Sequence, residues 1–410
     1  MTPLQRAQAV KALHNALVRN PSNAKAVENL PNAIRVLRMD PELAGILAYS
    51  EFHGTVMMMR AAPNLPLPGP YPRPMQDEDL DAVWVCVQES WLPKVGREIL
   101  TTAAVQVAHE HRYNPVRDWL DGLAWDGHKR LDSWLEHAFG AADTAGYHAS
   151  IGAKFLVAAV RRVRQPGVKF DHMLVLEGDQ GIGKSRACRA LFGDAWFTDD
   201  MPHDWKSKDA PMALLGVWGV ELADLEQLIR NEREVIKAFI SRQADRFRKP
   251  YGRGFIVQPR QSVFIATTND NDYLRDPTGG RRFWPVRCKF ANPEWIADNR
   301  DQLWAEAAAA EELGDTTWLD DRAVEDLAKL EQIARVGHDP WYDRIAGIIF
   351  ARTTITMDEI FDPNGLAIEI GLRGKRDVDR VAAILRLQGW ERVVEWNQVT
   401  QKAQRSWKKK

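Results

Sequence analysis

The sequence predicts an α/β fold in which a parallel sheet is covered by helices, with a helical N-terminal region and a small C-terminal module. Short apolar runs typical of buried strands alternate with helical segments between about residues 155 and 270. The first of these runs, residues 172–177, leads directly into a glycine-rich loop and a helix. On both sides of this region the sequence is typical of helices instead.

The composition indicates a soluble globular protein long enough for two or three domains. Of its 410 residues, 45% are apolar and 27% are charged. The formal net charge is −1, so any basic surface that binds nucleic acid must be local. The N-terminus lacks the apolar core of a signal peptide, and no stretch approaches the roughly 18 apolar residues that span a bilayer. We therefore expect a cytoplasmic protein with no membrane partner.

The cysteines give no sign of a disulfide framework or a zinc site. Cys86, Cys188 and Cys288 are far apart and belong to no Cys/His cluster. This pattern is typical of a reducing compartment.

Composition and periodicity divide the chain into five segments. The segment AAPNLPLPGPYPRP contains six prolines and predicts an extended linker. After residue 300 the chain becomes helical and rich in Ala and Glu. The predicted segments are a helical N-terminal region at 1–60, a proline-rich linker at 61–76, a helical domain at 77–150, the α/β core at 151–310, and a C-terminal helical part with a winged-helix-like module at 311–410.

Within the core, the expected elements follow one another as in a parallel sheet with helices on its faces. A helix is expected over 155–164 and a buried strand over 172–177. A strand at 214–222, a helix at 226–240 and a strand at 262–268 follow. In the C-terminal module, the order TTITMDEIF, KRDVDRVAAILRLQGW, ERVVEW and a basic tail resembles a winged helix.

The glycine-rich loop from Gly178 to Ser185 fits the pattern G-x-x-x-x-G-K-[ST] of a P-loop. Its glycines let backbone N–H groups converge on phosphate oxygens, and the helix N-terminus adds positive potential. We expect Lys184 to reach the β- and γ-phosphates of ATP and the Ser185 hydroxyl to ligate Mg²⁺. The predicted nucleotide-binding residues are Gly178, Asp179, Gln180, Gly181, Ile182, Gly183, Lys184, Ser185 and Arg186.

Hydrolysis also needs an acid at the end of a later strand. Glu221 follows a buried run and should lie at the carboxyl end of its strand, where it could hold Mg²⁺ through water or polarise the attacking water. Asp224 is the second candidate. Its alternative role is to cap the following helix.

Two further polar groups are candidates for catalysis. The apolar strand that begins VFIA ends in Thr267, Thr268 and Asn269, and an amide there could position the attacking water. Arg281 and Arg282 lie on a glycine-containing turn and could stabilise the charge on a transferring phosphoryl group, often from a neighbouring subunit. The alternatives are a plain turn for the first group and surface ion pairs for the arginines.

Between the acidic strand and the Asn269 strand lies a basic loop, residues 241–260, with six basic residues and one acid. Cations beside an aromatic ring suit single-stranded nucleic acid, because charge follows the phosphates and the ring stacks on a base. A solvated basic loop is the alternative. The predicted DNA-binding residues are Arg246, Arg248, Lys249, Tyr251 and Arg253.

From about Asn114 to Arg287, a little under half of the chain resembles the virulence-associated protein E family of phages, plasmids and integrated islands. The matching segments are NPVRDWLDGLAWDG, RLDSWL, LVLEGDQGIGKS, WGVELADL, KAFISRQADRFRKPYGR, FIATTND and TGGRRFWPV. The family looks like hexameric superfamily-three helicases and other AAA+ ATPases. The resemblance implies an acidic-strand role for Glu221, a sensor role for Asn269, an arginine-finger role for Arg281 or Arg282, and a pore hairpin around Lys249 to Arg253.

Two departures from that pattern matter. Leu222, not a second acid, follows Glu221, so the identity of the water-activating base stays open between Glu221 and Asp224. The N-terminal part carries no acidic catalytic motif of a primase, and we predict no primase activity.

These observations favour a hydrolase: an ATP-driven, helicase- or translocase-like motor on single-stranded or forked DNA in replication of a phage or other mobile element. It would need ATP and Mg²⁺ and would form a ring-shaped homo-oligomer. The family resemblance implies that this ring is a hexamer. The first alternative is an ATP switch that loads a helicase or regulates replication by recruiting another replication protein. The second is a non-enzymatic DNA-binding adaptor whose C-terminal module recognises an origin.

Overall fold

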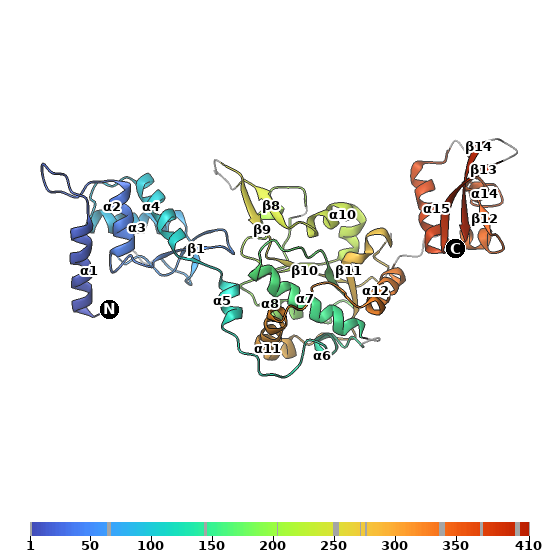
Figure 1. Ribbon diagram of the computed structural model, residues 1–410, viewed down its shortest axis with the longest axis horizontal. Helices are drawn as coiled ribbons and strands as arrows, with labels where there is room; N and C mark the ends of the chain where they lie inside the picture. The colour runs from blue at the N-terminus through green and yellow to red at the C-terminus, as the bar shows by residue number, and fades with distance from the viewer. Residues whose placement is uncertain are drawn as a thin grey trace.

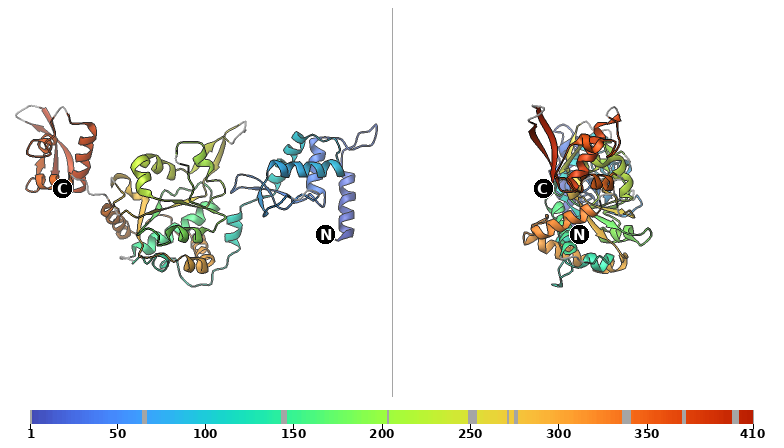
Figure 2. Two further views of the ribbon diagram at one scale, coloured as in Figure 1. Left: turned by 180° about the vertical axis from the view of Figure 1, so that it is seen from behind. Right: turned by 90° about the vertical axis from the view of Figure 1, so that its right-hand side faces the viewer.

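A computed structural model describes the protein as three lobes in a row (Figure 1 and Figure 2). The N-terminal and C-terminal lobes lie at opposite ends of a central lobe that holds the largest sheet. The described residues are 2–63, 67–142, 146–202, 204–248, 254–270, 272–274, 277–335, 341–369, 372–397 and 402–409.

The N-terminal lobe packs helices against a small sheet of order β3-β2-β1-β4. Its core takes buried side chains from Leu13 to Ala108, so it includes chain on both sides of the proline-rich segment. The elements are α1 (Pro3–Ala16), α2 (Leu30–Met39), β1 (Leu47–Ser50), β2 (Thr55–Met58), β3 (Arg73–Pro74), α3 (Asp77–Ser90), α4 (Arg97–Glu110) and β4 (Arg112–Tyr113).

Two expectations for this lobe are wrong. Residues 1–60 are not wholly helical, because 47–58 form an antiparallel hairpin. Residues 61–76 are not a separate linker, because Arg73 and Pro74 pair with β2, and Tyr71 packs against the lobe's core. Strands of two to four residues show too little periodicity to be recognised in sequence, and they form because tertiary pairing satisfies their backbone groups.

The central lobe is built on a five-stranded sheet of order β11-β5-β10-β7-β6. All four neighbouring pairs are parallel. The mixed α/β class with a parallel sheet is therefore as predicted. The strands are β5 (Met173–Glu177), β6 (Phe197–Thr198), β7 (Gly219–Leu222), β10 (Val263–Thr268) and β11 (Phe283–Arg287).

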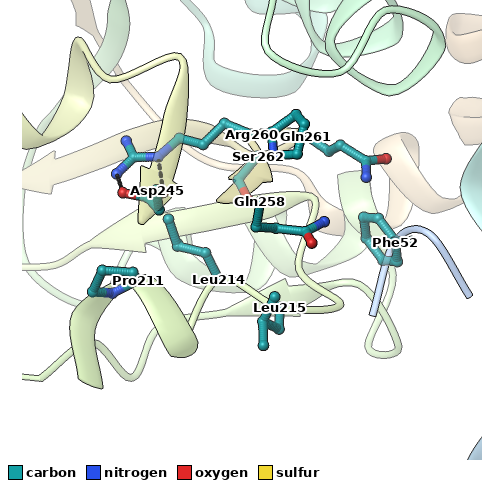
Figure 3. A pocket seen from close by; sticks show the side chains of 10 residues that line it. Phe52, Pro211, Leu214, Leu215, Asp245, Gln258, Arg260, Gln261 and Ser262 are labelled. Carbon is teal, nitrogen blue, oxygen red and sulfur yellow. Dashed lines mark hydrogen bonds and ion pairs between the residues drawn. The ribbon is translucent and has the colours of Figure 1, made fainter. Parts of the chain in front are cut away.

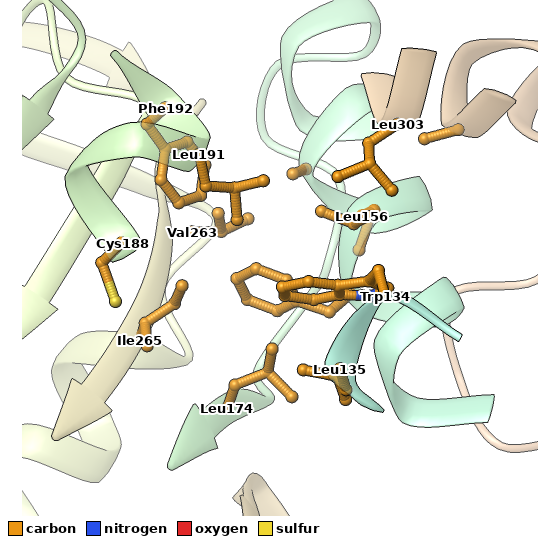
Figure 4. Close-up of a cluster of buried hydrophobic side chains, with 14 of the residues drawn as sticks. Trp134, Leu135, Leu156, Leu174, Cys188, Leu191, Phe192, Val263, Ile265 and Leu303 are labelled. Atoms are coloured by element: carbon orange, nitrogen blue, oxygen red, sulfur yellow. The ribbon is translucent and has the colours of Figure 1, made fainter. Parts of the chain in front are cut away.

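Within the described residues, six helices cover one face of this sheet. Alternate strand residues such as Leu174 and Ile265 point to this face and pack near Trp134 and Leu156 (Figure 4). Trp134, Trp218, Trp284 and Trp304 are fully buried there, so tryptophans anchor this core. The helices are α5 (Pro115–Asp121), α6 (Trp134–Phe139), α7 (Tyr147–Arg164), α8 (Lys184–Phe192), α11 (Pro293–Glu312) and α12 (Arg322–Ala334).

The other face packs against α9 (Asp209–Met212) and α10 (Leu225–Ile240). Met173 and Val175 of β5 point to this second face, opposite to Leu174, as the period of a strand requires. A separate antiparallel hairpin of β8 (Ala244–Phe247) and β9 (Ile256–Pro259) follows α10. Figure 1 shows this β8–β9 hairpin projecting from the central lobe.

The C-terminal lobe has its own core, which includes Ile345, Leu385 and Trp407. The basic segment at the C-terminal end is not a tail as expected, since 402–409 form a strand that pairs along β13. Val324 and Ala328 of α12 pack into the central core, so that helix belongs to the central lobe. The winged-helix class stays a prediction. The elements are α13 (Tyr342–Ile349), β12 (Thr354–Ile355), α14 (Met357–Phe361), α15 (Lys375–Leu387), β13 (Trp390–Asn397) and β14 (Lys402–Lys409), with sheet order β12-β14-β13.

The three cysteines are buried and carry free thiols. Burial raises the pKa of Cys188, and it raises the pKa of Cys288 to about 12, so both thiols stay protonated core groups. Within the described ranges, no helix has both the length and the apolar character needed to cross a bilayer.

Candidate functional site

The candidate site lies at the carboxyl edge of the central sheet, where β5, β7 and β10 end. The connection after β5 leads to β6, on one side of β5 in the sheet. The connection after β10 leads to β11, on the other side of β5. The strand order therefore reverses between β5 and β10. Open parallel sheets bind ligands at such a reversal, outside the carboxyl ends of the strands.

The glycine loop, Gly178 to Gly183, connects β5 to α8 at this reversal. A Cβ atom at Gly178 would lie 2.8 Å from the carbonyl oxygen of Cys288, and the residue has a φ of +155°. Gly183 is the N-cap residue of α8 and has a φ of +101°, a value that residues with a Cβ atom rarely adopt. The loop can therefore approach its neighbours closely and present the free N–H groups of the helix start to an anion.

Lys184 is the first residue of α8 and is folded over the glycine loop. Its Nζ donates to the carbonyl oxygens of Gly178 at 2.5 Å and Asp179 at 2.9 Å. Lys184 as a whole is 9% exposed. Its ammonium group is thus held at the mouth of the loop, where it could transfer these hydrogen bonds to phosphate oxygens.

Ser185, Glu221 and Thr267 meet below the loop. Glu221 Oε1 accepts hydrogen bonds from Ser185 Oγ at 2.6 Å and Thr267 Oγ1 at 2.7 Å. Glu221 is 1% exposed, and its Oε2 is buried with no hydrogen-bond partner in the described structure. A buried carboxylate oxygen without a partner is costly, and a divalent cation or its water would satisfy it. The pair Ser185 and Glu221 therefore fits Mg²⁺, which binds through one or two carboxylates plus waters and phosphates.

The other predicted residues of this edge are more exposed. Thr268 at the end of β10 pairs with Glu177 at the end of β5. Asn269 is the next residue, so Asn269 lies beside the glycine loop, and it is exposed. Asp224 is the N-cap residue of α10 with a φ of +51°, but its side chain makes no capping hydrogen bond. Arg186 is exposed and pairs with Glu294 on the surface.

A buried ion pair beside the loop was missed by the sequence analysis. Glu177 Oε1 accepts from Arg335 Nε at 2.6 Å and Tyr273 OH at 2.7 Å, and Oε2 accepts from Arg335 Nη2 at 2.8 Å. Burial, and then Glu177, raise the pKa of Tyr273, so its hydroxyl keeps its proton and donates. The one sequence signal was an acid at the end of an apolar strand, directly before Gly178.

Arg281 and Arg282 lie at the opposite, amino edge of the sheet. They end a 3-10 helix, Pro277–Arg282, and β11 begins with Phe283 beside Met173, the first residue of β5. Arg282 Nε donates to Ser241 Oγ at 2.9 Å and lies 3.9 Å from Asp171 Oδ2. Arg281 is exposed. The fold thus separates both arginines from Lys184 of the same chain by the length of the strands.

Comparison with known families identifies the central lobe. The family model of the virulence-associated protein E-like domain matches residues 120–336, more than half of the chain. The chain belongs to the virulence-associated protein E-like family. This confirms the family that the sequence motifs indicated.

Outside the family model, known proteins add little about this virulence-associated protein E-like chain. No curated protein matches it. A structure described as the apo structure of NrS-1 C terminal region (305-718) is 11% identical, covers 88% of this chain and 95% of that one, and has a TM-score of 0.43. An A form apo structure of the same region is 11% identical, covers 93% and 99%, and has a TM-score of 0.47. At these identities and TM-scores, the two structures support no inference about the function of this chain.

Within the family domain, the β8–β9 hairpin carries the predicted DNA-binding residues that are described. Arg246 and Arg248 are exposed on it. Lys249, Tyr251 and Arg253 lie outside the described residues. At the base of the hairpin, Arg260 Nε donates to Asp245 Oδ2 at 2.7 Å, and both side chains are almost fully buried.

A pocket lies at the amino edge, away from the glycine loop. Figure 3 shows Phe52 of the N-terminal lobe opposite Gln258 and Gln261, with Leu215 below. The amide groups of Gln258 and Gln261 both donate to the carbonyl of Glu51, at 3.1 and 3.2 Å. The pocket therefore marks where the N-terminal lobe contacts the base of the hairpin, and it has no catalytic groups of the carboxyl edge.

Proposed function

We propose that this protein is an ATP-dependent motor, helicase- or translocase-like, that acts on single-stranded or forked DNA in replication of a phage or other mobile element. The observation that carries the proposal is the contact of Ser185 with Glu221 directly below the glycine loop, where Glu221 Oε2 is buried and has no hydrogen-bond partner among the described residues. A phosphate-binding loop beside a partly unsatisfied acid suits hydrolysis of a nucleoside triphosphate.

In this proposal the glycine loop and Lys184 bind the phosphates of ATP through charge-assisted hydrogen bonds. Ser185 and Glu221 would hold Mg²⁺, which when bound neutralises charge on the phosphate oxygens. Glu221 or Asp224 accepts the proton of the attacking water, and the amide of Asn269 orients that water.

The charge of the transition state is stabilised by a second subunit. Arg281 is exposed at the amino edge and is separated from Lys184 of its own chain, so it would reach the nucleotide of a neighbour. Such an arrangement repeats head to tail and closes as a ring, for which we propose six subunits. The exposed arginines of the β8–β9 hairpin, Arg246 and Arg248, would bind the DNA strand electrostatically.

The decisive experiment measures ATP hydrolysis with and without single-stranded DNA for the wild type, Lys184→Ala and Glu221→Gln. We expect DNA to stimulate turnover, and each variant to lower it by about a hundredfold or more. Lys329→Ala is the matched control, since Lys329 lies on the surface of α12 and forms ion pairs with Glu325 and Asp326 there. It should hydrolyse ATP like the wild type.

The alternatives predict different results. Hydrolysis that Lys184→Ala abolishes but DNA does not stimulate would contradict the motor and favour an ATP switch that loads or regulates other replication proteins. DNA binding that is fully retained without any hydrolysis would favour a non-enzymatic adaptor.

A further inference from the structure

The two faces of the β8–β9 hairpin differ in character. The pairing places Arg246 opposite Val257 and Phe247 opposite Ile256. Asp245 and Phe247 point to the inner face and are buried. The side chains that alternate with them form an outer face, which consists of the exposed residues Ala244, Arg246, Arg248, Phe255, Val257 and Pro259.

Phe255 is the exposed aromatic residue of this outer face. The residue is 62% exposed, and Val257 is 64% exposed. The guanidinium carbons of Arg246 and Arg248 lie 4.8 and 5.4 Å from the centroid of the Phe255 ring. Both cations are thus gathered around one aromatic ring in a cation–π arrangement.

The outer face has an unbalanced positive charge. It carries no acidic side chain, and the described structure gives neither Arg246 nor Arg248 an ion pair. On the inner side the arrangement is the opposite, because Asp245 pairs with both Arg242 and Arg260. An exposed aromatic ring next to uncompensated cations is complementary to a ligand that is both anionic and flat.

We propose that Phe255 is a base-stacking residue, and that Arg246 and Arg248 bind the flanking phosphates of a single DNA strand lying on the outer face. This assignment rests on the proposed function and names the contact through which the motor holds its substrate. Tyr251 had been the expected aromatic, whereas Phe255 has the arginines around it.

The geometry favours a single strand over a duplex. Stacking on Phe255 needs an unpaired base whose flat face is free, whereas paired bases inside a duplex offer only edges and backbone. The arginines could bind the phosphates of either form. Loss of the ring should therefore weaken binding to a single strand much more than binding to a duplex.

The test compares binding of the full chain to a fluorescent oligo(dT) and to a blunt duplex, by anisotropy at one fixed salt concentration. Phe255→Ala and Phe255→Leu should each weaken oligo(dT) binding about tenfold or more, because leucine is apolar but cannot stack. Phe255→Tyr should bind like the wild type. Duplex binding should change less than about twofold in all three. Trp318→Ala, which removes a 55% exposed aromatic elsewhere, is the control and should bind as the wild type does.

A second measurement reports the contact itself. Ultraviolet irradiation of the wild-type complex with oligo(dT) should crosslink Phe255, as mapped by mass spectrometry of the peptides. Because Phe255 is exposed, its variants should unfold within about 2 °C of the wild type.

Other results would overturn the assignment in distinct ways. Wild-type affinity of Phe255→Ala, or of Phe255→Leu, would exclude stacking while leaving the motor proposal intact. An equal loss of duplex affinity would exclude the preference for a single strand. Absence of wild-type binding to oligo(dT), together with hydrolysis indifferent to DNA, would reject the proposed function as well. Failure to bind DNA with retained binding to an acidic peptide would identify the outer face as a protein-docking surface instead.

Discussion

The two edges of the central sheet carry different chemistry although the same strands run between them. At the carboxyl edge, the glycine loop, Ser185 and Glu221 form a small site with a buried carboxylate oxygen that has no partner in the part of the chain that the structure describes. The amino edge has Arg281 and Arg282, the base of the β8–β9 hairpin and the contact with the N-terminal lobe. A buried ion pair lies at each edge, Glu177 with Arg335 at the carboxyl edge and Asp245 with Arg260 at the amino edge.

This difference indicates that, in the proposed motor, the two edges of one chain act on different nucleotides. A strand of five residues spans roughly 17 Å, so groups at opposite edges of one chain cannot contact the same phosphate. β10 connects the edges directly. Near its start the Ser262 carbonyl accepts from the buried Arg162, and near its end Thr267 donates to Glu221. A change at the nucleotide could therefore reach the hairpin through β10.

The largest expected effect tests whether the amino edge acts on a neighbouring subunit. Lys184→Ala and Arg281→Ala should each reduce hydrolysis about a thousandfold when assayed alone. An equal mixture of the two proteins, after subunit exchange, should regain about a quarter of the wild-type rate, because one in four head-to-tail interfaces then has both groups intact.

Two controls sharpen this experiment. A mixture of Lys184→Ala and Glu221→Gln should stay inactive, because both residues belong to one edge and no interface has both. Arg282→Ala should have a smaller effect than Arg281→Ala, since Arg282 is already bound to Ser241. Absence of recovery in the first mixture would contradict action between subunits.

The next effect concerns the buried pair at the carboxyl edge. Arg335→Met leaves Glu177 buried with Tyr273 as its remaining side-chain donor, so we expect the free energy of unfolding to fall by about 3–5 kcal/mol. The double variant Glu177→Gln/Arg335→Met should recover part of that loss, because the unpaired charge is gone. Urea unfolding followed by tryptophan fluorescence measures both. Equal midpoints for wild type and Arg335→Met would show that the pair adds no stability.

The smallest effect is a pH dependence at the amino edge. Burial lowers the pKa of His172 to about 4; Asp171 opposes this shift, whereas Arg281 and Arg282 act in the same direction as burial. The ring stacks on Trp284 with centroids 4.4 Å apart. The unfolded state therefore binds the proton more readily, so this contribution to stability is present above about pH 6.5 and is lost as the pH falls toward 4.

Between pH 7 and pH 5 the loss should be about 2 kcal/mol, measured as a shift of the urea midpoint. His172→Phe keeps the stack and removes the titrating group, so its midpoint should change less over that range. His128→Phe is the control because the His128 side chain is 81% exposed, and it should keep the wild-type profile. Identical profiles for wild type and His172→Phe would contradict the lowered pKa.

How well the sequence predicted the molecule depended on how local the signal was. The strand at 173–177, the glycine loop and the helix at 184 were predicted because all three lie within twenty residues and each has a local pattern. The hairpin at 47–58 was missed because its strands are short and are defined by their partners. Glu177 was missed for a similar reason, since its partner Arg335 is 158 residues away.

The sequence did not predict which candidate residues lie at which edge of the sheet. In the sequence, Glu221 and Asn269 each follow an apolar run and Arg281 precedes one, and nothing there assigns the three residues to different sites. The register of β11 with β5 separates Arg281 from the other two. Likewise, the sequence gives no reason to prefer Phe255 to Tyr251 as the aromatic residue among the arginines. The pairing of β8 with β9 brings Phe255 beside Arg246.

The sequence by itself determined the α/β class, the glycine loop with its lysine and serine, and the family, because these depend on residue types at fixed short spacings. Tertiary structure decided which acid meets Ser185, which edge each arginine occupies and which aromatic ring lies among the cations. Those outcomes depend on strand order and register, and strand order and register are set by packing between segments that are distant in the chain.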